Sequence, residues 1–277
     1  MTQSAPPRLT DRTALARNRA RTRDEALFLH DLAIEDIQDR LAMVNRSFTD
    51  AAIVTGHPEK WANALGTSAR IIPDDEVLDL TPGAQDLVIH AMALHWADDP
   101  LGQIIQCARA LRPDGLFLAV FPGGQTLSEL RAALAQAEAE VTGGLSPRVA
   151  PMAEIRDMGG LLQRAGLALP VADGHPFTAT YPSALQLMRE LRHMGEGNAL
   201  AGRLRHPTRP RVLLRAAEIY AEAYGDPASD HRIPATFDLV TLTGWSPDDS
   251  QPKPLRPGSA TTRLADALNA RDLPLKD

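Results

Sequence analysis

The clearest pattern of hydrophobic and polar positions lies between residues 86 and 121. The run Leu87–Ile89 is apolar without polar alternation, which is typical of a strand buried on both faces. In residues 98–111, apolar side chains recur at helical spacing behind an aspartate cap, Asp98 or Asp99, and a proline in the first turn. A turn at 112–115 leads to a second apolar run, 116–121. A strand, a crossover helix and a second strand predict a βαβ unit in a parallel sheet.

Weaker periodicities place the remaining elements around this unit. Helices are expected over residues 24–44, 58–65, 152–165, 183–194, 213–224 and, short, 261–269. Another helix is expected to begin at Thr126, where Thr126 and Glu129 match a capping box, and to end at Gly143. Strands are expected over residues 51–54, 70–73, 167–171, 177–181 and 236–243. The segment between 70–73 and Asp86 is too short for a helix, so we expect these two strands to be neighbours and one βα unit to be missing.

The predicted domain organisation has three parts. Residues 1–50 form a basic N-terminal arm and a helix, residues 51–245 form the α/β domain, and residues 246–277 form a Pro-rich tail. A net charge of -6 argues against binding of nucleic acid by the whole protein. No apolar run approaches the ~20 residues that span a bilayer, and the first residues lack the apolar core of a secretory signal. The single cysteine, Cys107, fits a reducing compartment and is expected to be a packed, inert thiol.

The N-terminal arm is basic within an acidic chain. Six arginines lie between residues 8 and 23, with few apolar partners. One interpretation is a solvated helix or a disordered leader. The other is a docking arm for an acidic partner or an anionic membrane surface.

The strand at 51–54 ends where a nucleotide-binding fold places a glycine-rich turn. Only Gly56 is present, and Pro58 has no N–H to offer a ligand. Asp74 follows 18 residues after Gly56 (74 minus 56), close to the ~20 expected of a ribose-binding acid. A solvated turn is the alternative for Asp74 and its acidic neighbours. The sequence contains neither a nucleophile elbow nor a P-loop.

His95 and Trp96 follow the end of the central strand, on a loop expected to face the ligand crevice. Histidine transfers protons near neutral pH, and tryptophan offers a flat apolar wall. The alternative is a tryptophan that only packs on the core. His90 and His95 flank this loop, but paired cysteines and an HExxH motif are absent, so no metal site is expected.

Several segments resemble a known family. LHWADDP (94–100), ALRPDGLFLAVFPGGQTLSELR (110–131), GGLSPRVAP (143–151) and MGEGN (194–198) resemble the methyltransferase-like assembly factors of respiratory complex I, within the class I S-adenosylmethionine-dependent methyltransferases. The resemblance to carrier-protein methyltransferases of the biotin pathway is weaker. The family implies a Rossmann-like methyltransferase sheet, here shortened by about one βα unit, with helical N-terminal and inserted elements.

The same resemblance implies an S-adenosylmethionine site and a role in building complex I, where the family is linked to hydroxylation of an arginine in the iron–sulfur subunit. Gly56, Asp74 and His90 would bind the cofactor, with Asp74 as the adenine-side acid and the strand of the ribose-binding acid deleted. His95 and Trp96 would be catalytic. The first methyltransferase motif reads LDLGCGxG in the family and AIVTGHPEK (52–60) here, so it keeps one glycine.

Two functions follow from these observations. The first is an enzyme that modifies a side chain of a complex I subunit at an S-adenosylmethionine-type site. The second is a non-catalytic assembly chaperone on a degenerate methyltransferase scaffold. The expected location is cytoplasmic and peripheral at the inner membrane, which the Arg-rich arm would contact.

Overall fold

The computed structural model describes residues 8–65, 68–229 and 231–252. The chain divides into a large unit, residues 1–247, and a C-terminal unit, residues 248–277, of which only 248–252 are described, as a turn. The predicted helix at 261–269 and most of the predicted tail lie outside the described residues. No described helix has the length and apolar character needed to cross a membrane.

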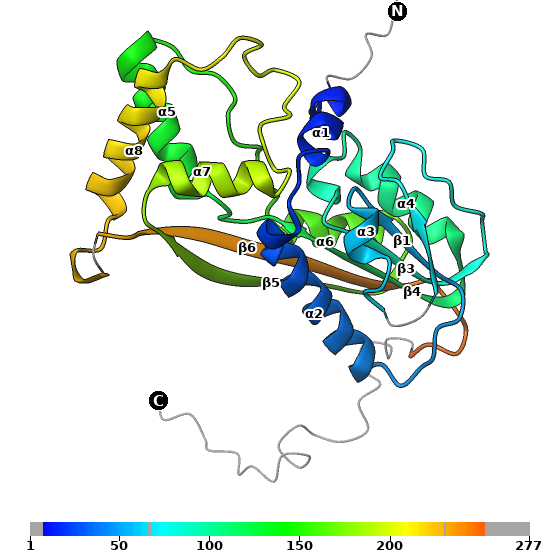
Figure 1. Cartoon of the computed structure of the whole chain (residues 1–277). Coiled ribbons are helices and arrows are strands. Elements are labelled where there is room, and N and C mark those ends of the chain that lie inside the picture. The colour runs from blue at the N-terminus through cyan, green and yellow to red at the C-terminus, as the bar shows by residue number, and fades with distance from the viewer. Residues whose placement is uncertain (1–7, 66–67, 230, 253–277) are drawn as a thin grey trace, which may run out of the picture. The chain divides into compact units, whose positions relative to one another are not determined.

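The large unit is built on one mixed sheet with the strand order β2-β1-β3-β4-β6-β5 (Figure 1). Its strands are β1 (Ala51–Thr55), β2 (Ala69–Ile72), β3 (Gln85–Ala91), β4 (Leu111–Pro122), β5 (Ala168–Tyr181) and β6 (Ile233–Trp245). The pairs β1/β2, β1/β3 and β3/β4 are parallel, whereas β6 runs antiparallel between β4 and β5. The predicted Rossmann-like architecture is therefore confirmed.

Helices accompany these strands in chain order. They are α1 (Arg12–Arg19), α2 (Phe28–Met43), α3 (Pro58–Trp61), α4 (Pro100–Ala110), α5 (Ser128–Thr142), α6 (Ile155–Arg164), α7 (Ala184–His193) and α8 (Pro210–Tyr224). Short 3-10 helices are η1 (Asp24–Ala26), η2 (Leu94–Trp96) and η3 (Pro227–Ser229). The predicted βαβ unit is confirmed as β3, α4 and β4, and Asp99 rather than Asp98 caps α4 by accepting from the Gly102 N–H at 2.8 Å.

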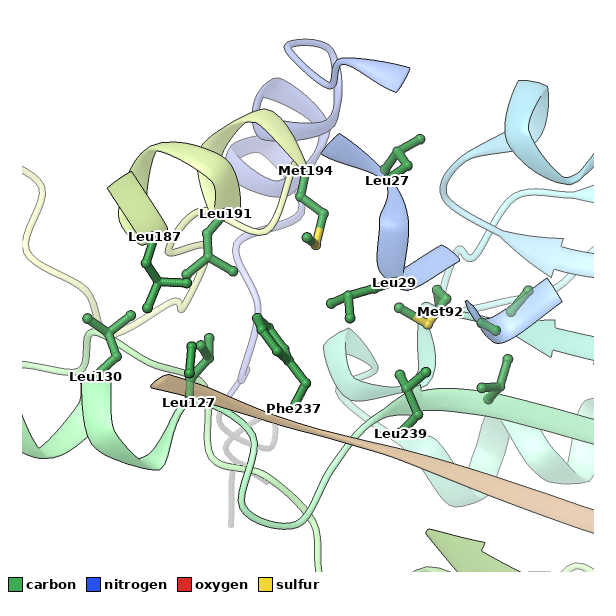
Figure 2. Packing of buried hydrophobic residues seen from close by; sticks show 14 of the residues in the cluster. Leu27, Leu29, Met92, Leu127, Leu130, Leu187, Leu191, Met194, Phe237 and Leu239 are labelled. Carbon is green, nitrogen blue, oxygen red and sulfur yellow. The ribbon is translucent and has the colours of Figure 1, made fainter. Parts of the chain in front are cut away.

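Two buried clusters cover opposite faces of the sheet. Leu87 and Ile89 of β3 point into a cluster shared with α2, α3, α5, α7 and α8, whereas Val88 between them points into a cluster shared with α4 and α6. Because both faces of β3 are covered, its sequence lacks polar alternation. At one end of the first cluster, side chains from α5, α7 and β6 converge, among them Leu130, Leu187 and Phe237 (Figure 2).

Four sequence-based expectations are wrong in detail. β2 lies at the edge of the sheet and is separated from β3 by β1. The βα unit that the described residues lack is therefore the one whose strand would pair with the free edge of β2. Asp74 therefore follows the second strand, which is the position of a ribose-binding acid, and the strand carrying that acid is present. The two strands predicted at 167–171 and 177–181 form one long strand, β5, with a register shift near its start.

The fourth error concerns the capping box at Thr126. Helix α5 begins at Ser128, and its N-cap, Leu127, has a left-handed φ of 54°. The Thr126 hydroxyl pairs instead with the backbone of Asp238, accepting from its N–H at 2.9 Å, and the Glu129 carboxylate accepts from the hydroxyl of Thr236. Both side chains therefore fix strand β6 against the start of α5.

Candidate functional site

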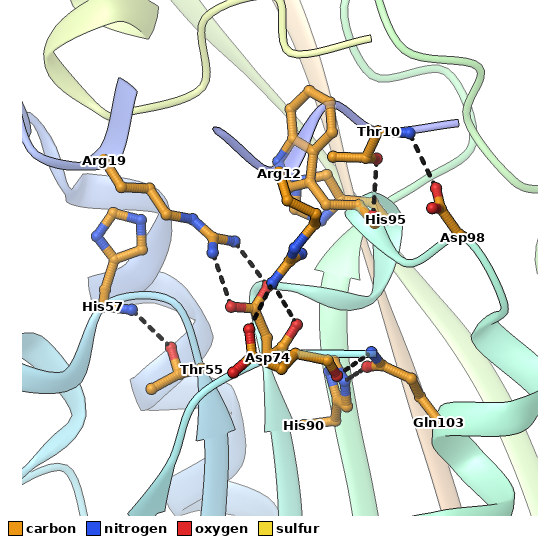
Figure 3. Close-up of polar contacts among 12 residues, drawn as sticks. Thr10, Arg12, Arg19, Thr55, His57, Asp74, His90, His95, Asp98 and Gln103 are labelled. Carbon is orange, nitrogen blue, oxygen red and sulfur yellow. Dashed lines mark hydrogen bonds and ion pairs between the residues drawn. The ribbon is translucent and has the colours of Figure 1, made fainter. Parts of the chain in front are cut away.

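The candidate site lies at the carboxyl ends of β1, β2 and β3, where parallel sheets bind ligands. Gly56 follows β1, Asp74 follows β2, and His95 and Trp96 lie on η2 beyond β3. The structure places these predicted residues at the same end of the sheet, as Figure 3 shows for Asp74 and His95, but Gly56 and Asp74 line one cavity whereas His95 and Trp96 line another. A cleft there is lined by residues of α1 together with Gly56 and Asp74.

Asp74 is held by two arginines of helix α1. Arg19 donates from both Nη atoms, to Oδ1 at 2.7 Å and to Oδ2 at 3.0 Å, and Arg12 donates to Oδ2 at 3.3 Å (Figure 3). The Asp74 side chain is only 6% exposed. Burial alone would raise the pKa of its carboxyl, but the charges and hydrogen bonds of Arg19 and Arg12 hold that pKa below the usual value.

Gly56 lies directly under the same guanidinium. A Cβ built on Gly56 would stand 2.1 Å from Cζ of Arg19. The absence of a side chain therefore lets the guanidinium approach the backbone at the end of β1, where a ligand would be expected to lie.

The N-terminal arm is consequently part of the site, and the interpretation of a solvated or disordered leader is wrong for Arg12 and Arg19. The Asp98 carboxylate accepts from the backbone N–H groups of Leu9 and Thr10 at 2.8 and 2.9 Å. The Thr10 hydroxyl donates to the carbonyl of Trp96 at 2.8 Å. These bonds fix the segment before α1 to the loop that carries the predicted catalytic residues. The other arm arginines, Arg8, Arg17, Arg21 and Arg23, are exposed.

His95 and Trp96 meet a carboxylate that the sequence analysis did not single out. Glu196, in the turn after α7, accepts from the Trp96 indole N–H at 2.9 Å and lies 3.1 Å from Nε2 of His95, both through Oε2. Its Oε1 is buried and has no hydrogen-bond partner among the described residues. Burial would raise the pKa of Glu196, but His95, and more weakly Arg19, lower it strongly.

These three residues are among those that line a cavity of about 220 Å³. Its walls are mostly apolar and come from the start of α5, the loop before α6, α7 and β6, with Leu127, Leu130, Leu191, Met194 and Phe237 among them (Figure 2). The lining therefore combines mostly apolar side chains with the Glu196 carboxylate, with an imidazole and an indole beside that carboxylate, and with the guanidinium groups of Arg148 and Arg192.

A second set of buried side chains with hydrogen-bonding atoms lies next to the Gly56 turn and consists of His30, His57 and Trp61. The Trp61 indole N–H donates to Nδ1 of His30 at 3.0 Å, and the rings of His30 and His57 meet edge to face at 4.5 Å between centroids. Burial, and then the neighbouring His57, lower the pKa of His30 to about 3. Burial likewise lowers the pKa of His57. Both rings are therefore neutral at neutral pH.

His90, predicted to bind the cofactor, is fully buried beneath the acidic loop. Its Nε2 lies 2.6 Å from Oε1 of Gln103, whose amide donates to the carbonyl of Asp75 at 2.9 Å. Burial lowers the pKa of His90 to about 4, although the bond to Gln103 acts against this shift. His90 thus supports the loop that presents Asp74, through Gln103. Among the described residues, no cluster of His, Cys, Asp or Glu is arranged to hold a metal ion.

No family model matches the chain. The arginine-hydroxylase NDUFAF5, mitochondrial, of Danio rerio is 39% identical over 196 residues, which are 71% of this chain and 60% of that protein. The Homo sapiens protein of the same name is 36% identical over 196 residues, 71% of this chain and 56% of the relative. This chain is a homologue of these proteins over the matched span. The resemblance predicted from the sequence is thereby confirmed.

The malonyl-[acyl-carrier protein] O-methyltransferase of Laribacter hongkongensis is 35% identical over 179 residues, 65% of this chain and 57% of that protein. The chain thus spans less than two thirds of the length of each of these relatives. Among solved structures, the YcgJ protein of Bacillus subtilis matches with a TM-score of 0.46 and 13% identity, over 82% of this chain and all of that one. A Haemonchus contortus phosphoethanolamine N-methyltransferase 2 in complex with S-adenosyl-L-methionine matches with a TM-score of 0.40 and 10% identity, over 75% of this chain and 51% of that one.

An adenosyl cofactor would need the surface over Gly56 and hydrogen bonds to Asp74. Both residues have the right type and position, but Arg19 covers the first and pairs with both carboxylate oxygens of the second. In this conformation the residues present do not fit the cofactor. The sequence could have indicated Arg19 only as one of six similar arginines, and Glu196 only through its place in the segment 194–198.

Proposed function

We propose that this protein modifies an arginine side chain of a partner protein, a subunit of respiratory complex I, and that the cavity lined by Glu196 receives that side chain. The observation that carries the proposal is the buried Oε1 of Glu196, which has no partner among the described residues and belongs to a side chain that lines a mostly apolar cavity. The name of the relatives, arginine-hydroxylase, agrees with it.

The apolar side chains and the carboxylate of the lining suit an arginine side chain, and Arg148, one of the two arginines of the lining, is already paired with Glu138. Arginine has an apolar stem and a planar head with five N–H donors, and it pairs strongly with carboxylates. The apolar walls would contact the stem, and Oε1 of Glu196 would accept from the head, since Oε2 is already engaged by Trp96 and His95. His95 would stand next to the bound guanidinium, where it can hold or release a proton.

Hydroxylation is the modification that the relatives' name indicates, and methylation is the one indicated by the resemblance to methyltransferases. The iron–sulfur subunit is the partner suggested by the sequence resemblance. Because the relatives are named mitochondrial, we place this protein at the membrane that carries complex I, with the exposed arginines of the arm available for contact.

The test replaces the carboxylate without changing its shape. In cells lacking the gene, the native protein, Glu196→Gln and Glu35→Gln would each be expressed, and complex I subunits analysed by mass spectrometry for an altered arginine. Glu35 is exposed on α2 and serves as the matched control. We expect Glu35→Gln to restore the modification and Glu196→Gln to lose it. An altered arginine at native levels with Glu196→Gln would refute the role of the cavity.

A non-catalytic chaperone is the second candidate, favoured by the arginine that covers the cofactor position. The chaperone and the enzyme predict different outcomes for a triple variant that combines His95→Ala, Trp96→Ala and Asp74→Ala. A chaperone so altered should still restore complex I whenever it folds, whereas an enzyme should not. Circular dichroism and the melting temperature of the purified variant establish whether it folds.

A further inference from the structure

We propose that Arg19 is a built-in occupant of the adenosyl position, and that an adenosyl ligand binds only when the Arg19 side chain leaves Asp74. This inference goes beyond the proposed function and does not depend on the identity of the modified residue. It rests on the juxtaposition of Arg19, Gly56 and Asp74 at the carboxyl ends of β1 and β2 (Figure 3).

The guanidinium and a ligand cannot share the position. Cζ, Nη1 and Nε of Arg19 lie 2.1 to 2.5 Å from the place of a Cβ on Gly56, so not even a methyl group fits between them. Both oxygens of Asp74 accept from Arg19, and Oδ2 also accepts from Arg12. A ribose hydroxyl would have to replace Arg19 at the carboxylate.

The backbone of Arg19 packs closely against Gly195, so the movement that we infer is confined to the Arg19 side chain. Cα of Arg19 lies 3.3 Å from the place of a Cβ on Gly195. Helix α1 is anchored at its other end by Asp11, which caps it by accepting from the Ala14 N–H and pairs with Arg203 at 2.9 Å. The helix would remain docked while its last side chain rotates away.

One N–H group of the Arg19 guanidinium has no acceptor among the described residues, which lowers the free energy needed to release this side chain. Nε of Arg19 is buried without a hydrogen-bond partner among the described residues, and an unsatisfied buried donor lowers the stability of the arrangement that contains it. The apparent dissociation constant of a ligand equals its intrinsic value divided by the fraction of molecules in the open form. Removing the occupant therefore tightens binding.

The experiment is a calorimetric titration with S-adenosylhomocysteine of the full chain and of the variants Arg19→Ala and Arg17→Ala. Arg17 is an exposed arginine on the same helix and is the matched control. We expect Arg19→Ala to bind about tenfold tighter or more than the native chain, and Arg17→Ala to bind as the native chain does. The double variant Arg19→Ala with Asp74→Ala should lose the gain, because the ligand then lacks its acceptor.

Equal or weaker binding by Arg19→Ala, including the absence of heat from both proteins, would overturn the inference. Arg19→Met, which keeps the length of the stem, replaces Arg19→Ala if the latter does not fold, and the same gain is expected of it. Failure of this test leaves the proposed arginine modification standing, because the titration measures ligand binding and the mass spectrometry measures the altered arginine.

Discussion

Acidification should destabilise this protein well before its carboxylates titrate, because two histidines are buried in the neutral form. His30 and His90 are both fully buried. Burial lowers their pKa values from 6.5 in the unfolded chain to about 3 and about 4, respectively. The unfolded state therefore binds protons that the folded state excludes, and stability must fall as the pH drops below 6.5.

The magnitude follows from the distance between the working pH and the unfolded pKa. Each group costs about 1.4 kcal/mol per pH unit below 6.5, so each costs about 2 kcal/mol at about pH 5. Together they remove about 4 kcal/mol, a large part of the ~5–15 kcal/mol of a typical domain. His57, whose pKa is also lowered, acts in the same direction. The lowered pKa of Asp74 contributes a loss only at lower pH, near the unfolded carboxyl pKa of 3.8.

Urea unfolding at about pH 8 and about pH 5 measures this loss as a change in the free energy of unfolding. The variant His90→Asn should lose about 2 kcal/mol less than the native chain over that range, whatever its stability at about pH 8. His206→Asn is the control, because His206 is exposed. A native protein whose stability changes by less than about 1 kcal/mol, or an unchanged loss in His90→Asn, would refute the reasoning.

Two further predictions use matched pairs of residues. Gly195→Ala should lower the free energy of unfolding by about 2 kcal/mol, because Gly195 has φ +86° and its new Cβ would lie 2.7 Å from Oγ1 of Thr22. The control is Gly160→Ala, whose new Cβ would lie in open space on α6. In thermal unfolding, this control should be neutral or stabilising. Asp98→Ala should speed hydrogen exchange across α1, because it removes the acceptor of the two backbone N–H groups that fix the segment before this helix. The control Asp99→Ala removes the N-cap of α4, so it should lower the free energy of unfolding by about 1 kcal/mol but leave exchange in α1 unchanged. Equal effects within either pair would contradict the packing described for it.

The central strands could be predicted from the sequence because their pattern is local. Val88 and its neighbours are apolar on both sides, which reports burial on both faces without knowledge of the partners. The start of α5 could not be predicted in the same way. Thr126 and Glu129 have the spacing of a capping box, but their side chains bond to Asp238 and Thr236, more than one hundred residues away. Partners from strand β6 therefore take the place of the local contacts that a capping box would make.

The residues of the candidate site also differ in whether the sequence could predict their position. Gly56, Asp74 and His95 could be placed together from topology, since the carboxyl ends of parallel strands share one edge. Arg19 and Glu196 could not, because one precedes the sheet and the other follows α7, and neither has a spacing that ties it to a strand end. Sequence periodicity reports the scaffold of the site but not the charges that distant segments add to it.

The charges around Asp74 determine what can replace Arg19. One buried carboxylate faces two guanidinium groups, Arg12 and Arg19, so the departure of Arg19 leaves Arg12 donating to Oδ2 and leaves Oδ1 without a donor among the described residues. A buried acceptor left unsatisfied costs about 1–3 kcal/mol, and more when it is charged. A ligand that displaces Arg19 must therefore donate to Oδ1, as a hydroxyl group of a ribose can. An adenosyl ligand lacking the ribose hydroxyls would leave Oδ1 unsatisfied and should not displace Arg19.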